Sequence, residues 1–209
     1  MLSLTIDDII RRIEKGEIFE ATSKDGGFRI AIKEYVPYVC TAIHDGHAFR
    51  NELKLKTALT DYERWYEEDP YTADFISSMP IVLAGKDSRF EYDLNRKPET
   101  CIYKEAWGKK VWKQALTRAE RERSLTKHSN YYRVTHALIS KLESMFDGCV
   151  VYDMHSYNYK RWERDVPVFN IGAELIDEKK YGKMVKAWKK ELAAIELPNG
   201  IVNKSAIND

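Results

Sequence analysis

The sequence predicts an α/β fold with a mostly parallel central sheet and helices on both faces. Short apolar runs, each typical of a buried strand, alternate along the 209 residues with segments of helical periodicity. Strands of a parallel sheet are covered on both faces and therefore read as continuous apolar runs. In such a sheet, ligands bind beyond the carboxyl ends of the strands.

The expected elements follow one another in a regular order. A first helix follows Thr5, with isoleucines at helical spacing and Gly16 suited to its C-cap. Two short strands then flank the sequence KDGG, which is a hairpin signal. Further strands are expected at 35–43, 78–85, 149–154 and 166–172, and further helices at 51–69, 106–123, 131–146 and 178–195.

Composition narrows the classes of function. The 34 Lys and Arg residues nearly balance 33 Asp and Glu, which gives no support to a nucleic-acid or membrane-surface partner. No apolar run approaches the roughly 20 residues of a membrane-spanning helix, and the N-terminus does not read as a signal peptide. The cysteines, Cys40, Cys101 and Cys149, lack CxxC spacing and fit a reducing compartment. We therefore expect a cytoplasmic protein of one domain, residues 1–209.

Two predicted strands end in similar polar sequences. In VCTAIHDGH, His44 directly follows the apolar run of the first strand. In VVYDMHSYN, His155 stands at the end of the second strand. Imidazole is the commonest metal ligand, and three protein ligands plus water make a catalytic zinc site. The acid cluster EEDPY offers Glu68 or Asp69 as the third ligand, and His47 forms a possible pair with His44. The alternative is that both histidines are solvent-facing strand ends, and spacing alone favours that alternative.

Two further features lie close to these strand ends. Asp153 precedes His155 by two residues, so in an extended segment both side chains share a face and the carboxylate can hold the imidazole. The stretch DSRFEYDLNR carries Arg89, Asn95 and Arg96. A planar guanidinium grips a carboxylate through two parallel hydrogen bonds, which suggests a carboxylate-bearing substrate. The alternative is a solvated loop with ordinary surface charge.

Six short motifs occur in the order typical of one family, and residues 39–172 resemble the N-formylglutamate amidohydrolases. The resemblance implies a three-layer sandwich of the phosphorylase/hydrolase-like kind, similar to that of the zinc carboxypeptidases and aspartoacylases. It also implies metal-dependent hydrolysis of an N-acyl amino acid such as N-formylglutamate. The motifs are AIHDG, EEDPYTADF, SRFEYDLNR, YYRVTHALISKL, VVYDMHS and VPVFNIG.

Carried onto this chain, the resemblance implies a zinc ion bound by His44, Asp69 and His155. Glu68 is the alternative for the acid. The related carboxypeptidases place an acid three residues after the first histidine, where this chain has His47 instead.

The resemblance also implies residues that bind the substrate. Asn95 and Arg96 correspond to the pair that binds the substrate carboxylate, with Arg89 as a helper. His136, on a predicted helix, is expected to face the site, although a hydrogen-bonded helix histidine is an equal alternative.

The chain departs from the family pattern in two places. The stretch HDGHAFRNE lacks the usual proline. The family normally continues past the position of Asp209 into a strand with a glutamate, so we expect a domain that lacks its C-terminal part, binds metal and hydrolyses N-formylglutamate poorly. Glu174 is the nearest substitute base, and an acid at a helix start is the alternative reading. Rival functions are a related zinc peptidase or amidase, and a degenerate member that binds without catalysis.

Overall fold

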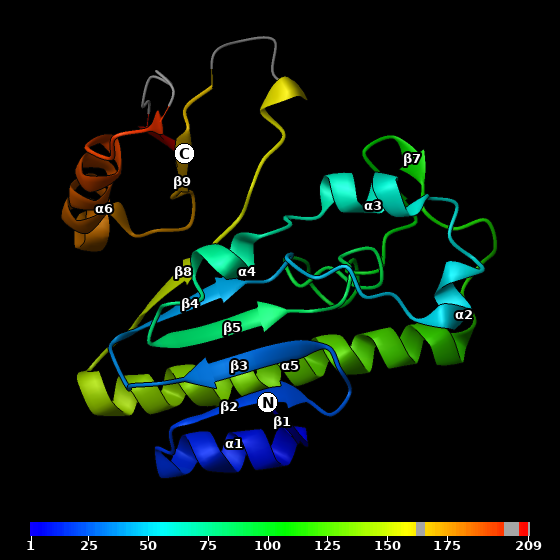
Figure 1. Cartoon of the computed structure of the whole chain (residues 1–209), viewed down its shortest axis with the longest axis horizontal. Helices are drawn as coiled ribbons and strands as arrows, with labels where there is room; N and C mark the ends of the chain where they lie inside the picture. Colours follow the sequence, from blue (N-terminus) through cyan, green and yellow to red (C-terminus); the bar gives the residue numbers. More distant parts are fainter. Residues whose placement is uncertain (162–165, 199–204, 209) are drawn as a thin grey trace. The chain divides into compact units, whose positions relative to one another are not determined.

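Six strands form one sheet in the order β1-β2-β3-β5-β4-β8 in the computed structural model (Figure 1). The neighbours β5, β4 and β8 run parallel, as do β1 and β2, whereas β3 is antiparallel to both of its neighbours. The predicted mostly parallel sheet is therefore confirmed. The strands are β1 (Leu2–Leu4), β2 (Phe19–Ser23), β3 (Phe28–Ile32), β4 (Tyr38–Ala42), β5 (Ile81–Gly85) and β8 (Val150–Asp153).

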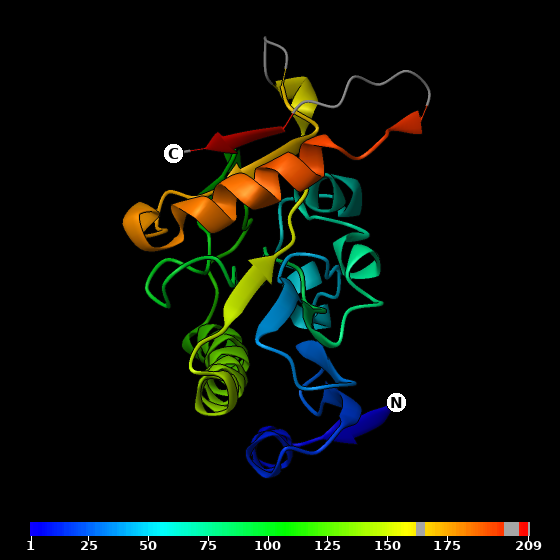
Figure 2. The ribbon, with the colours of Figure 1, turned by 90° about the vertical axis from the view of Figure 1, so that its left-hand side faces the viewer.

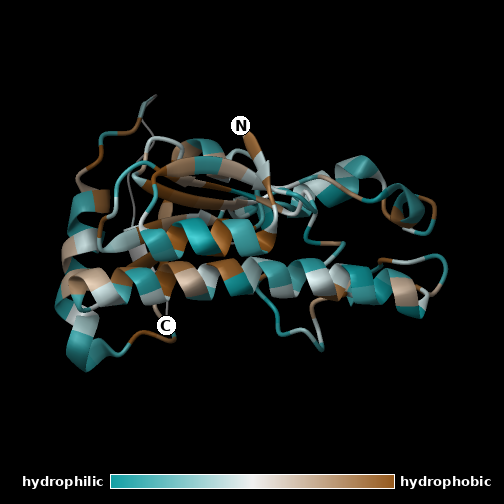
Figure 3. Cartoon of the chain, turned by 90° about the horizontal axis from the view of Figure 1, so that it is seen from below, coloured by the Kyte–Doolittle hydropathy of each residue, from teal (hydrophilic) through white to brown (hydrophobic). Residues whose placement is uncertain are grey.

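Helices cover both faces of this sheet (Figure 2). On one face, α1 (Ile6–Lys15) packs against α5 (Arg118–Phe146), and the two helices run side by side in Figure 3. Their apolar residues join the main core with alternate residues of β4 and β5, such as Val39 and Leu83. The intervening residues of those strands join a smaller core on the other face with α4 (Thr72–Phe75). Both faces are thus occupied, as the continuous apolar strands predicted.

The structure describes residues 1–161, 166–198 and 205–208. The chain divides into two units, Met1–Tyr157, which contains the sheet, and Asn158–Asp209. In the second unit, parallel strands β9 and β10 pair with each other and α6 packs against both. No helix within the described ranges is long and apolar enough to cross a membrane. The elements of this unit are η1 (Tyr159–Arg161), β9 (Phe169–Gly172), α6 (Glu178–Ala193) and β10 (Ser205–Asn208).

The prediction of one helix over 51–69 was wrong, because backbone groups in the middle of this segment form hydrogen bonds with residues 111–113. Residues 51–69 instead contain two short helices, α2 (Asn51–Lys54) and α3 (Asp61–Glu67). Between them, the Ala58 amide donates to the Val111 carbonyl at 2.8 Å, and the Lys113 amide donates to the Lys56 carbonyl at 2.7 Å. These pairings take the backbone groups that a continuous helix needs.

The predicted helix at 131–146 is confirmed as the end of a longer helix, whereas the predicted helix at 106–123 was wrong over residues 106–117. α5 begins at Arg118, where Thr117 and Glu120 form a capping box, and continues to Phe146. The residues before it form a hairpin of β6 (Glu105–Ala106) and β7 (Lys109–Lys110). Helical composition alone did not reveal this turn, in which two consecutive residues have positive φ.

Two glycines let the segments after β4 and β5 approach each other at backbone distance. A Cβ atom on Gly46 would lie 2.2 Å from the Lys86 carbonyl carbon, and one on Gly85 would lie 2.5 Å from the Ile43 carbonyl oxygen. The Ala48 amide donates to the Lys86 carbonyl at 2.9 Å in the same contact. Glycine in the HDG sequence is therefore required by close backbone packing.

We expect Gly46→Ala to destabilise the protein, because the new methyl group must displace the backbone of Lys86. Overpacking costs about 1–3 kcal/mol, which corresponds to roughly 2–10 °C in Tm for a chain of this size. Gly172→Ala is the control, since a Cβ there meets no described atom within 4 Å. Thermal unfolding of both variants makes the comparison, and equal Tm values would contradict the expectation.

Candidate metal centre

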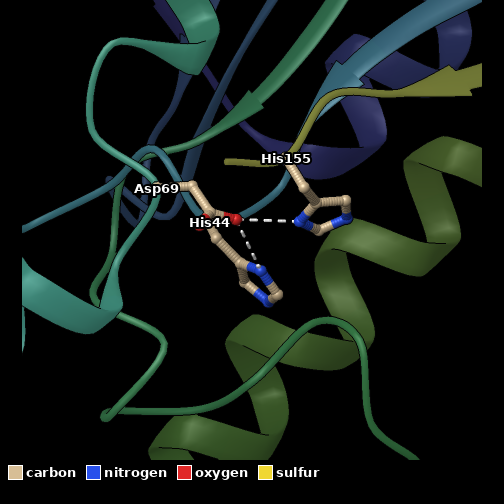
Figure 4. A group of neighbouring side chains, drawn as sticks. All are labelled: His44, Asp69 and His155. Carbon is tan, nitrogen blue, oxygen red and sulfur yellow. Dashed lines mark hydrogen bonds and ion pairs between the residues drawn. The ribbon is translucent and has the colours of Figure 1, made fainter. Parts of the chain in front are cut away.

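Three side chains from separate segments meet beyond the carboxyl ends of β4 and β8 (Figure 4). His44 follows β4, His155 follows β8 and Asp69 follows α3. One ligand atom from each of the three lies within 4.8 Å of the others. Asp69 Oδ2 lies 2.8 Å from His155 Nδ1 and 3.4 Å from His44 Nδ1, so the carboxylate sits between the two rings.

The sheet and one backbone bond explain this convergence. Because β4 and β8 are parallel and Thr41 pairs with Asp153, both strands end at the same edge and deliver their histidines there. The Asp69 amide donates to the His44 carbonyl at 3.0 Å, which ties the acid to the first histidine. Glu68 has an extended conformation, with φ −75° and ψ 166°. Neighbouring side chains of an extended segment point to opposite sides, so Asp69 faces His44 and His155 and Glu68 does not.

Glu68 and His47 bind each other instead of joining the group. The Glu68 carboxylate contacts His47 Nδ1 and accepts a hydrogen bond from the Ser88 hydroxyl. It also lies 3.6 Å from the guanidinium of Arg64, which is fully buried. Of the three residues considered for the acid position, Asp69 is thus the one that the structure places beside His44 and His155.

A further carboxylate holds the far nitrogen of each imidazole. Asp93 Oδ1 lies 2.7 Å from His44 Nε2, and Asp153 Oδ2 lies 2.8 Å from His155 Nε2. Asp153 also accepts a hydrogen bond from the Thr41 hydroxyl at 2.6 Å. Such carboxylates fix the orientation of a ligating histidine and favour the tautomer whose other nitrogen is free. Both rings therefore present Nδ1 toward Asp69.

Asp93 is fully buried and accepts four hydrogen bonds. Besides His44, its donors are Arg89 Nη2 at 2.9 Å, the Asn95 amide at 2.6 Å and the Tyr103 hydroxyl. Burial alone would raise the pKa of Asp93, but the contacts with His44, Arg89 and Tyr103 outweigh burial and lower it. Burial and the neighbouring Asp93 charge raise the pKa of Tyr103 to about 12. Asp93 is therefore an ionised acceptor in the protein interior.

The chemistry of the group fits a divalent metal ion. Because an ionised carboxylate only accepts, His44 donates Nε2–H to Asp93, and a neutral ring then leaves a lone pair on Nδ1. That Nδ1 atom is buried and has no hydrogen-bond partner among the described residues. Two imidazole nitrogens and one carboxylate oxygen are the donor set of many catalytic zinc sites. The residues present could thus hold zinc with a further position left open.

In the metal-free protein, a proton on His155 offsets part of the negative charge at the group. Burial alone would raise the pKa of Asp69, but the hydrogen bond to His155 and the proximity of His44 lower it. For His155, burial lowers the pKa, whereas Asp153 and Asp69 raise it more strongly, to about 10. His155 is therefore a cation between two carboxylates, and a bound metal ion would have to displace its proton.

The family model for N-formylglutamate amidohydrolase matches residues 36–200, which is most of the chain. The chain belongs to the N-formylglutamate amidohydrolase family. The resemblance stated from the motifs is thereby confirmed. No curated protein sequence matches the chain.

The fold has a counterpart among solved structures. The crystal structure of gene product Atu2144 from Agrobacterium tumefaciens matches with a TM-score of 0.67 at 15% sequence identity. The match covers 88% of this chain and 73% of that one. At this identity the likeness supports the shared α/β fold.

The other residues that the sequence predicts for the candidate site have separate contacts and exposures. Arg89 is engaged by Asp93 and by the Glu67 carbonyl, to which its Nη1 donates at 3.2 Å. Asn95 and Arg96 are exposed, and Arg96 forms no ion pair with any residue that the structure describes. His136 is exposed on α5, with its ring centroid 6.2 Å from that of Tyr132. The roles of these residues in substrate binding stay predictions.

Glu174, the predicted substitute base, lies in the second unit. It is exposed in the turn between β9 and α6. The acid in the first turn of α6 is Glu178, and the cap is Asp177, so Glu174 is not part of the helix start. Its catalytic role stays a prediction.

Sequence reasoning missed two residues that support the centre. Asp93 lies within the DLNR motif, but no role was assigned to it, and Tyr103 gave no signal at all. The spacing of Asp93 from His44 is 49 residues, so only the folded chain reveals the contact.

In the metal-free protein, we expect the stability that protonated His155 contributes to be lost at alkaline pH. Its pKa is raised from 6.5 to about 10, so its contribution is complete below pH 6.5 and is lost as the pH rises through about 10. The Tm of chelator-treated protein should fall between pH 7 and pH 10, and the fall should be smaller in His155→Gln. Parallel thermal scans test this, and identical pH dependence in both proteins would contradict it.

Proposed function

We propose that this family member is a metal-dependent hydrolase of the amide bond of an N-acyl amino acid such as N-formylglutamate. In this proposal, His44, Asp69 and His155 hold zinc. The observation that carries the proposal is the buried Nδ1 atom of His44, which has no hydrogen-bond partner among the described residues and faces Asp69. A buried acceptor nitrogen without a partner is costly, and a metal ion would satisfy it.

The protein's own residues supply rigidity and orientation. The chemistry that zinc supplies in a three-ligand site is a water of pKa about 7 and a polarised carbonyl group. Asp93 and Asp153 bind the Nε2 atoms of the two imidazole rings, so the Nδ1 ligand atoms are preorganised. Proton transfer to the departing amine requires a carboxylate or imidazole within reach, and Glu174 is the residue predicted for it.

An arginine without a carboxylate partner among the described residues supports a substrate that carries a carboxylate. The charge of Arg89 is balanced by Asp93 at 2.9 Å, whereas Arg96 is exposed and forms no ion pair within the described ranges. Arg96 follows Asn95, and the backbone of this pair is anchored by Asp93 through the Asn95 amide. Because its charge is not already paired with a described carboxylate, Arg96 is the arginine that we propose binds the carboxylate of the amino acid.

Substitutions at the centre should show whether Asp69 or Glu68 is the zinc ligand. Protein loaded with zinc should retain about one equivalent after dialysis, and His155→Ala or Asp69→Asn should lower zinc affinity by more than about 100-fold. Loss of an outer partner alone typically costs 10–100-fold, so loss of a ligand should cost more. Elemental analysis and chelator competition measure this. Glu68→Gln is the matched control, and the assignment is wrong if this variant loses as much zinc as Asp69→Asn.

Arg96→Lys should weaken binding of N-formylglutamate about tenfold. The lysine keeps the positive charge but loses the planar fork that grips a carboxylate through two bonds. Calorimetry with zinc-loaded protein measures the Kd. Arg118→Lys is the control, since the Arg118 side chain is 92% exposed and its ion pair is with Glu122. Unchanged affinity in Arg96→Lys, together with weakened binding in Arg89→Lys, would transfer the role to Arg89.

The hydrolytic activity itself is tested by measuring formate release from N-formylglutamate by zinc-loaded protein. The proposal requires that turnover is lost on metal removal and restored by zinc. Hydrolysis that persists in Asp69→Asn protein without metal would refute metal dependence. Where turnover is measurable, Glu174→Gln should lower it by about 10²–10⁴ if Glu174 is the base.

A further inference from the structure

The tip of the β6–β7 hairpin carries a residue that the local backbone does not favour. The turn consists of Trp107 and Gly108, with φ values of 48° and 73°. A two-residue hairpin turn with two positive φ values suits Asn-Gly, and a bulky residue pays a steric penalty there. Trp107 is nevertheless held in place, which points to a role for its side chain.

The indole ring of Trp107 packs on both side chains that donate to Asp93 Oδ2. The Arg89 guanidinium carbon lies 4.9 Å from the ring centroid, in cation–π geometry. The Tyr103 ring meets the indole edge-on, with centroids 5.9 Å apart. Arg89 Nη2 and the Tyr103 hydroxyl both donate to Asp93 Oδ2, while Asp93 Oδ1 holds His44. One exposed ring therefore covers the support of one candidate metal ligand.

Arg89 also reaches the segment that carries the second candidate ligand. Its Nη1 donates to the Glu67 carbonyl at 3.2 Å, two residues before Asp69. The guanidinium thus joins the support of His44 to the backbone before Asp69, and it is only 11% exposed. Trp107 itself is 44% exposed, and its ring covers one face of this guanidinium.

We propose that Trp107 is a positioning residue for the candidate metal centre. It acts through Arg89 and Tyr103 on Asp93, and through Asp93 on the orientation of His44. This inference rests on the proposed function, because it concerns the affinity of the same centre for zinc. Loss of the ring should let water reach the Arg89–Asp93 pair and leave the His44 ring less firmly held.

Trp107→Asn and Trp107→Phe distinguish the effect of the aromatic ring from the effect of the hairpin conformation. Asparagine before glycine suits this turn, so Trp107→Asn keeps the hairpin and removes the ring. Phenylalanine keeps an aromatic face for Arg89. We expect Trp107→Asn to lower zinc affinity about tenfold and Trp107→Phe to restore most of it. Trp65→Ala is the control, since Trp65 is 40% exposed and stacks on Tyr62, and it should change affinity by less than about twofold.

A double substitution tests the route through Asp93. In an Asp93→Asn background, Trp107→Asn should weaken zinc binding little further, because the ring acts through that carboxylate. The visible absorption spectrum of the Co²⁺-loaded variants reports ligand geometry, and Tm reports folding. If Trp107→Asn leaves zinc affinity unchanged, or if it causes the same loss of affinity again in the Asp93→Asn background, this inference is overturned and the proposed function is not. A wild-type protein that binds no zinc would overturn both this inference and the proposed function.

Discussion

The arrangement of the centre depends on one carboxylate, that of Asp69, held between two imidazoles. Each ring is fixed at Nε2 by another aspartate, Asp93 at 2.7 Å and Asp153 at 2.8 Å. With both far nitrogens taken, the Nδ1 atoms have one direction left, toward Asp69. Three carboxylates around two imidazoles are an excess of negative charge. Arg89 and a proton on His155 offset part of it in the metal-free protein, and a divalent cation would offset it in the loaded one.

The fold serves this arrangement by bringing separate segments to one edge of a sheet. Parallel pairing of β4 with β8 places both histidines beyond the same strand ends. Glycine at position 46 lets the loop after His44 pack directly on the backbone after β5, and the His44 carbonyl accepts a hydrogen bond from the Asp69 amide. Buried charge is tolerated because Asp93 has four donors. The three candidate ligands and the carboxylates that support them all lie in the first unit, Met1–Tyr157.

Local patterns predicted what local interactions determine. Thr5 and Gly16 delimit α1 as expected, since a cap needs only its own helix. His44 and His155 could be placed together because parallel strands share an edge. The break between α2 and α3 could not be predicted, because it depends on pairing with residues 111–113, and the partner of His44 lies 49 residues away. Arg89 was predicted as a substrate helper, but in the structure its guanidinium holds Asp93.

In the proposed centre, the Nδ1 atoms of His44 and His155 and a carboxylate oxygen of Asp69 bind one metal ion. Anomalous scattering at the zinc absorption edge from crystals of zinc-loaded protein locates such an ion. We expect a single strong peak about 2.0–2.2 Å from these three atoms. A peak at the His47–Glu68 pair, or at the Nε2 side of His155 with Asp153, would contradict it.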